Sequence, residues 1–244
     1  MPDLSLSDHL PNRRPDHQPP DKSWLPRQRH GTTPQMIGRY PEYDVFDAAG
    51  TWDAATARVI DERMAKGSRP LTFFTADEEP TVRAFCDVVT AQDGEPRVPV
   101  VELVDEKLSA GRLDGYQYDD MPDDRETWRI MLRGLDETAR ERYAAAGFAA
   151  LDGEAREAVI AQLAAGSLHG ESWDVLNVKR AFAVCMRVVL AEFYSHPWAW
   201  NEIGFGGPAY PRGYMRLGPL AVREPYEKRG ATDEDPVPFA REER

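Results

Sequence analysis

A chain of 244 residues is long enough to bury a substantial core, either as one large domain or as two small ones. Its 42 acidic side chains outnumber the 30 basic ones, and the net charge of −12 argues against nucleic acid or anionic membranes as partners, since both attract clustered Lys and Arg. No apolar run approaches the ~18 residues that cross a bilayer, so we expect a soluble protein without direct membrane insertion.

Prolines divide the chain into a body and two arms. Eight of the 20 prolines precede residue 42, and seven more follow residue 196, which leaves five for the long middle section. The predicted domains are an extended Pro-rich arm over 1–50, a helical domain over 51–218 and a C-terminal tail over 219–244.

The predicted arm has two parts. Met1 to about Gly31 has few large apolar residues that could offset its ordering entropy, so it is expected to be disordered in isolation. After Gln35, apolar anchors that include Val45, Phe46 and Trp52 indicate an extended segment docked on a surface.

The middle section carries apolar residues at helical spacing, between residues that begin and end helices. The predicted helices are Thr51–Lys66 with Thr51 as N-cap, a helix after the Thr75–Glu78 capping box, Val100 to Gly111 after Pro99, a helix capped by Asp123 or Asp124 that carries Trp128 and Leu135, Asp152 to Gly166, and Trp173 to about Tyr194 capped by Ser172. No stretch alternates as a half-buried strand does. The sequence therefore predicts an all-α fold, a compact helical domain of about five to six helices with long Pro/Gly/aromatic-rich arms.

The two cysteines and the N-terminal arginines bear on the compartment. Cys86 and Cys185 both lie inside apolar helical patterns, which favours buried free thiols, although sequence spacing leaves a disulfide open. Arg13-Arg14 is followed by no apolar region that an export machinery could recognise, so we expect no signal peptide. The expected location is the cytoplasm, unless another protein carries the chain to the periplasm or cell envelope.

The segment Phe193–Gly218 combines seven aromatic residues with repeated Gly and Pro. Its prolines and glycines predict an ordered loop rather than a regular helix or strand. Such a concentration of Trp, Tyr and Arg is typical of residues that dominate binding to proteins. We predict a partner interface in which His196, Asn201 and Glu202 fix the shape of the loop, and its residues are His196, Trp198, Trp200, Asn201, Glu202, Tyr210, Arg212 and Tyr214.

A search for reactive groups predicts no catalytic, cofactor-binding or metal-binding residues. The chain lacks GxGxxG after a strand, a Walker sequence, HExxH and CxxC, and its five histidines occur singly. Three alternatives stay open: His196 as a general base beside Glu202, a cation at the paired acids near Asp119 and Asp123, and a tryptophan platform for a sugar. They leave a stand-alone sugar-binding protein or enzyme, using residues 193–218, as the alternative function.

The order of these features resembles the gluconate 2-dehydrogenase subunit 3 family. The likeness begins at Phe73-Phe74-Thr75-Ala-Asp-Glu78, continues through Phe85-Cys86-Asp87-Val88-Val89, and includes Leu151-Asp152. It ends with Phe193-Tyr194-Ser195-His196-Pro197 and the glycine-rich stretch to Gly218, so it covers about three-fifths of the chain.

This resemblance implies a non-catalytic accessory subunit that stabilises or matures a large flavoprotein of the glucose-methanol-choline type. Such complexes oxidise sugars, sugar acids or alcohols. FAD is then expected in the partner and no cofactor in this chain. In better-known members of the family a cytochrome subunit receives the electrons, and the small subunit often carries a twin-arginine signal. This chain has a polar Pro-rich arm in place of that signal.

Overall fold

The computed structural model describes residues 45–65, 70–92, 97–112 and 117–208. Over these residues the chain forms seven α-helices and two short 3-10 helices, with no strand, which confirms the predicted all-α class. The elements are η1 (Val45–Thr51), α1 (Ala54–Met64), α2 (Glu79–Thr90), α3 (Val100–Ser109), α4 (Asp124–Tyr143), η3 (Phe148–Ala150), α5 (Gly153–Ala165), α6 (Val178–Phe193) and α7 (Pro197–Ile203).

The chain divides into two compact units. The central unit consists of residues 66–93 and 99–193, and it holds α2 to α6. The terminal unit combines residues 1–65, 94–98 and 194–244, and its described elements are η1, α1 and α7. The domain boundaries predicted at residues 50 and 218 stay predictions, since most of both arms lies outside the described residues.

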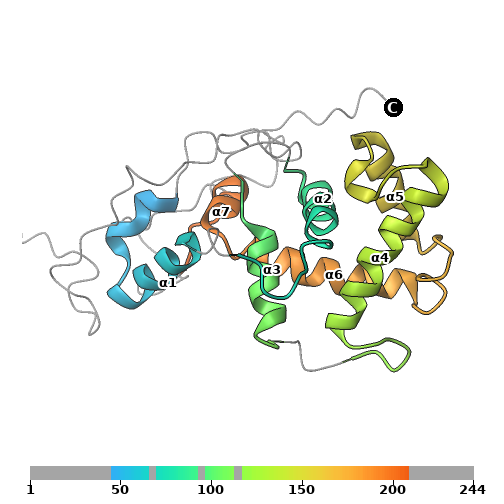
Figure 1. Ribbon diagram of the computed structural model, residues 1–244. Coiled ribbons are helices and arrows are strands. Elements are labelled where there is room, and N and C mark those ends of the chain that lie inside the picture. Colours follow the sequence, from blue (N-terminus) through green and yellow to red (C-terminus); the bar gives the residue numbers. More distant parts are fainter. Residues whose placement is uncertain (1–44, 66–69, 93–96, 113–116, 209–244) are drawn as a thin grey trace, which may run out of the picture. The chain divides into compact units, whose positions relative to one another are not determined.

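Helix α6 is the middle of the central unit, as its apolar circumference predicts. It packs against α3, α4 and α5, and in Figure 1 it runs in orange past the green α3 and α4. The surrounding core is made of large side chains with almost no exposure, among them Phe85, Leu108, Trp128, Met131, Leu132, Leu135, Phe148, Leu163, Leu168 and Trp173.

The predicted start of this helix at Ser172 and Trp173 is wrong, because tertiary contacts with α4 hold those residues in turns. The indole Nε1 of Trp173 donates to Thr138 Oγ1 at 2.9 Å. A Cβ added to Gly134 would lie 2.6 Å from that indole, so this glycine permits the close approach. Helix α6 begins only at Val178.

Most predicted helix boundaries agree with the capping contacts. Asp123 Oδ1 accepts from Glu126 N at 3.0 Å before α4, and Asp152 Oδ1 accepts from Ala155 N at 2.8 Å before α5. Gly166 ends α5 with φ of 74°. Both cysteines are free and buried, as the helical pattern favours. Burial raises the pKa of the Cys86 and Cys185 thiols, so both stay protonated.

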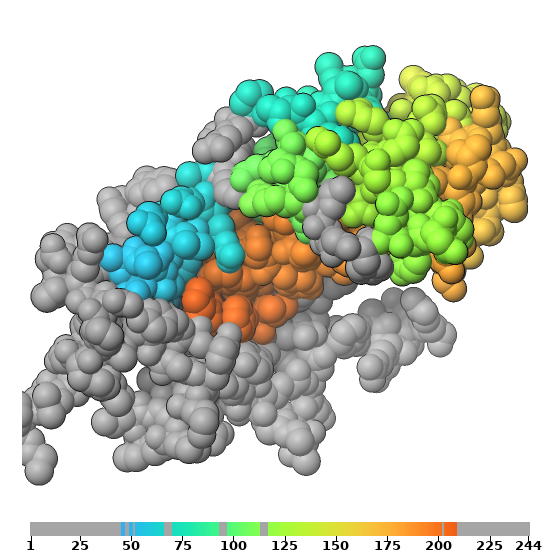
Figure 2. Space-filling view, turned by 90° about the horizontal axis from the view of Figure 1, so that it is seen from below, coloured from blue at the N-terminus to red at the C-terminus, as the bar shows by residue number. Residues whose placement is uncertain are grey.

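The terminal unit has its own apolar cluster. Its buried members are Val45, Phe46, Ala49, Trp52, Ala57, Ile60 and Trp200, with Met64 and Phe205 packed against them. In Figure 2 the orange-red residues near 200 lie beside the blue residues near 50, in agreement with the contact of α7 with η1.

Two predictions for this unit are corrected. The predicted anchors Val45, Phe46 and Trp52 are buried, but the backbone from Val45 to Thr51 is a 3-10 helix rather than extended. Asp53, not Thr51, is the N-cap of α1, because its Oδ1 accepts from Thr56 N at 2.7 Å while Thr51 already belongs to η1.

Candidate functional site

Part of the predicted aromatic loop is a helix. Pro197 occupies the first turn of α7, where a missing N–H removes no intrahelical bond, and Gly204 ends the helix with φ of 68°. The side chain of His196 caps this helix, since its Nδ1 accepts from Trp198 N at 3.3 Å. The prediction that no regular helix forms between 193 and 218 is therefore wrong for Pro197–Ile203.

Both tryptophans of α7 are largely withdrawn from solvent. Trp200 is 3% exposed, and its Nε1 donates to the carbonyl of Tyr194 at 2.7 Å. The ring of Phe205 meets it edge-on at 5.8 Å, and the Arg63 guanidinium lies 5.8 Å from its centroid. Trp198 is 7% exposed and packs edge-on against the His196 ring at 5.0 Å. These two rings therefore belong to the packing of the chain itself.

The polar residues of the segment hold its shape. Burial, and secondarily the charge of Arg63, lower the pKa of His196 to about 3, so the imidazole is neutral at pH 7. A base so weak is poorly suited to accept a proton from a substrate near neutral pH. Asn201 Oδ1 accepts from Val45 N at 2.7 Å, which ties α7 to η1.

The remaining predicted interface residues have no described surroundings. Tyr210, Arg212 and Tyr214 lie outside the described residues, and so does the side chain of Glu202. Their role at a partner interface stays a prediction.

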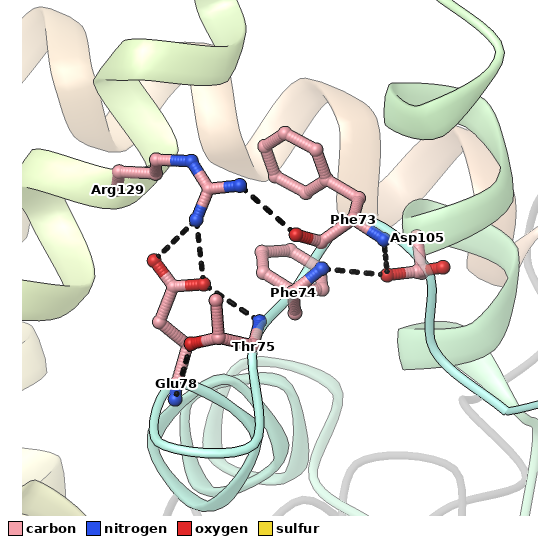
Figure 3. A network of polar contacts seen from close by, with 6 residues as sticks. All are labelled: Phe73, Phe74, Thr75, Glu78, Asp105 and Arg129. Carbon is pink, nitrogen blue, oxygen red and sulfur yellow. Dashed lines mark hydrogen bonds and ion pairs between the residues drawn. The ribbon is translucent and has the colours of Figure 1, made fainter.

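A second aromatic segment, the strap Thr72–Thr75, precedes α2 in the central unit (Figure 3). The buried carboxylate of Asp105, on α3, holds it from one side. Asp105 Oδ1 accepts from the backbone N–H groups of Phe73 and Phe74, both at 2.9 Å. Its Oδ2 accepts from Thr72 N at 2.7 Å and from Thr72 Oγ1 at 3.1 Å. One side chain thus satisfies four donors.

Arg129, on α4, holds the strap from the other side. Its Nη1 donates to both carboxylate oxygens of Glu78 at 2.7 Å, and its Nη2 donates to the carbonyl of Phe73 at 2.9 Å. The guanidinium carbon lies 4.5 Å from the Phe73 ring centroid, within cation–π range. Glu78 also accepts from Thr75 N at 2.8 Å, while Glu78 N donates to Thr75 Oγ1 at 3.3 Å, which confirms the predicted capping box.

A hollow of about 420 Å³ opens beside the strap. Its lining comes from the strap, the end of α3 and the beginning of α4, and consists of Thr72, Phe73, Ser109, Asp123, Arg125, Glu126 and Arg129. A second arginine, Arg125, lies 5.4 Å from the centroid of Phe73, so two guanidinium groups contact one ring.

The sequence predicts the Thr75–Glu78 capping box and a family resemblance at this segment, but not the contacts of Asp105 and Arg129 that hold the strap. One feature of the sequence indicates that Asp105 is buried. It occupies a position four residues after Val101 and three before Leu108, so a carboxylate interrupts the apolar face of α3. A buried acid at such a position needs donors, and the strap supplies them.

In the described part of the chain, no three or more His, Cys, Asp or Glu side chains gather as a metal would require. None of the described helices has both the length and the hydropathy of a membrane span.

Comparison with protein families gives one match. The model described as gluconate 2-dehydrogenase subunit 3 matches residues 76–207, which is more than half of the chain. The match covers α2 to α7, so it includes both the central unit and the aromatic α7. Searches of curated proteins and of solved structures gave no significant match.

Proposed function

We propose that this chain, which belongs to the gluconate 2-dehydrogenase subunit 3 family, is the non-catalytic accessory subunit of a flavin-dependent dehydrogenase. Its partner is a large flavoprotein of the glucose-methanol-choline type, which binds FAD and oxidises a sugar, a sugar acid or an alcohol. The accessory chain stabilises this partner or helps it to mature. The family match over α2 to α7 is the observation that carries the proposal.

The chemistry of the described residues agrees with a supporting role. His196, the histidine nearest to the aromatic segment's tryptophans, is buried and a weak base. Both cysteine thiols are buried with raised pKa, and thiolates rather than thiols act as nucleophiles. Trp198 and Trp200 leave little ring surface on which a sugar could stack, so the sugar-platform alternative lacks support.

Expression of the flavoprotein with and without this chain tests the proposal. We expect the co-expressed flavoprotein to be more soluble, to contain more FAD per polypeptide and to be more active. Equal solubility, flavin content and activity in both preparations would contradict the accessory role. Co-expression with the Asp105→Ala variant of this chain should give intermediate solubility, FAD content and activity. The variant loses the acceptor of two buried amides, so the accessory chain is less stable.

A further inference from the structure

The hollow beside the strap contains hydrogen-bond donors that have no acceptor among the described residues. Arg129 donates through Nη1 to the Glu78 carboxylate and through Nη2 to the Phe73 carbonyl. A guanidinium has five N–H groups, so Nε and the second Nη2 proton remain without an acceptor among the described residues. The bonds to Glu78 and to the Phe73 carbonyl fix the orientation of these remaining donors.

Arg125 makes fewer hydrogen bonds to the described residues than Arg129 does. It is exposed, and its hydrogen bond to the Ser109 carbonyl is long, at 3.4 Å. Across the described residues it forms no ion pair, although acidic residues precede and follow it in the sequence. A cation in the first turn of α4 is also disfavoured by the helix dipole. Contact with the Phe73 ring holds the guanidinium over the hollow without neutralising its charge.

The acidic residues of the lining indicate what kind of anion fits. Asp123 uses Oδ1 to cap α4, and the exposed Glu126 contributes a second negative charge. With Glu78 paired to Arg129, the acidic groups at the hollow slightly outnumber the basic ones, so a free anion gains little from long-range attraction. A carboxylate presented by an adjoining protein surface gains from orientation and from the high local concentration that other contacts provide.

We propose that this hollow receives an Asp or Glu side chain of the large flavoprotein subunit, bound between Arg125 and Arg129. The partner's identity rests on the proposed function, whereas the carboxylate chemistry follows from the two arginines. Their planar donors match the two oxygens of a carboxylate, and Arg is among the residues that most often dominate protein interfaces. In the complex, the carboxylate then replaces water as the acceptor for the remaining donors of both arginines.

The first test measures binding of the full-length chain to the flavoprotein. Arg125→Glu reverses the charge at an exposed position, so we expect folded protein with a dissociation constant raised by about tenfold or more. Arg125→Lys should bind with intermediate affinity, because it keeps the charge and loses the planar fork. Arg142→Glu is the matched control, since Arg142 is an exposed arginine of the same helix that contacts Gln162.

Binding of Arg125→Glu within about twofold of the wild type would overturn the proposal, provided that circular dichroism shows the same helicity. High salt should weaken the wild type more than Arg125→Glu.

A second test separates this proposal from the proposed function. If the wild-type chain binds no flavoprotein, the accessory role fails, and the purified chain is then titrated with sodium acetate while the arginine Nε–H signals are followed by NMR. Clearly larger shifts at Arg125 and Arg129 than at Arg142 would support a carboxylate site and overturn the flavoprotein as its source. Shifts of the same size at all three arginines would overturn the site as well.

Discussion

The two aromatic segments of this chain use their rings in opposite ways. In the terminal unit, Trp198 and Trp200 are buried, the indole N–H of Trp200 donates to the Tyr194 carbonyl, and the His196 ring caps α7. In the central unit, the strap is held just as firmly through its backbone, but Phe73 supports two arginines that keep unused donors beside a hollow. The described tryptophans of the terminal unit therefore serve its own packing, whereas the strap places an aromatic ring and two arginines at a hollow.

The two aromatic segments depend on different contacts for their folding. Substitutions in the two segments should therefore differ in how much, and in what way, they change the free energy of unfolding.

Trp200→Ala should lower the free energy of unfolding by about 3–5 kcal/mol, because it empties the centre of the terminal cluster and removes the bond to the Tyr194 carbonyl. Urea denaturation followed by far-UV circular dichroism measures the loss. Tyr143→Ala is the control, since that ring is 40% exposed. A loss no larger than the control's would mean that Trp200 is not a core residue, and would return it to the partner interface.

Asp105→Ala should cost about 3 kcal/mol, because the buried amides of Phe73 and Phe74 lose their acceptor. Hydrogen exchange should accelerate at these two amides before it changes in α6. Asp119→Ala, at an exposed acid of the central unit, should leave exchange unaltered. Continued protection of both amides in the Asp105 variant would show that the strap is held by something other than this carboxylate.

His196 should make stability depend on pH. Its pKa of about 3 in the folded chain lies below the ordinary 6.5, so the unfolded chain binds a proton that the folded chain excludes. Its contribution is complete above pH 6.5 and is lost progressively as the pH falls toward 3. Between pH 6 and 5 the wild type should lose about 1 kcal/mol more than His196→Asn, in which Asn can still cap α7. Parallel pH profiles for the two proteins would contradict a neutral, buried imidazole.

Glu78→Gln should have the smallest effect, about 0.5–1 kcal/mol, since it weakens a capping box and an ion pair whose side chains are 20% and 35% exposed. The urea midpoint at low and high salt measures it, and the difference from the wild type should shrink as salt rises. Glu62→Gln, in a more exposed pair with Arg58, should be nearly neutral. An equal effect of the two changes would mean that Arg129 does not depend on Glu78 for its orientation.

Much of the fold follows from local signals in the sequence. The caps at Asp123 and Asp152, the Thr75–Glu78 box and the glycine that ends α5 all act within a few residues, so the sequence predicts them well. The errors occur where distant contacts outweigh local preference. Trp173 lies in a turn because Gly134 of α4 leaves room for its ring and the Thr138 hydroxyl of α4 accepts a hydrogen bond from its indole N–H.

The candidate site likewise has features that the sequence predicts and features that only the three-dimensional structure shows. The resemblance found from short motifs identified the family, and it placed the strap at the beginning of the family-like region. The hollow required knowledge of three elements that meet, since Phe73, Ser109 and Arg125 are far apart in sequence. No periodicity in one helix reveals that two guanidinium groups share a ring.

The contacts of Asp105 and Arg129 with the strap also determine the order in which this part of the chain can fold. Asp105 lies 31 to 33 residues after the donors that it accepts, and Arg129 lies 51 to 56 residues after its strap partners Glu78 and Phe73. During synthesis the amides of Thr72, Phe73 and Phe74 therefore lack their carboxylate acceptor until α3 has emerged, and the Phe73 ring has no guanidinium beside it until α4 follows. The strap that leads into α2 is held by residues of α3 and α4, which follow it in the sequence. The hollow therefore exists only once α2, α3 and α4 have packed together.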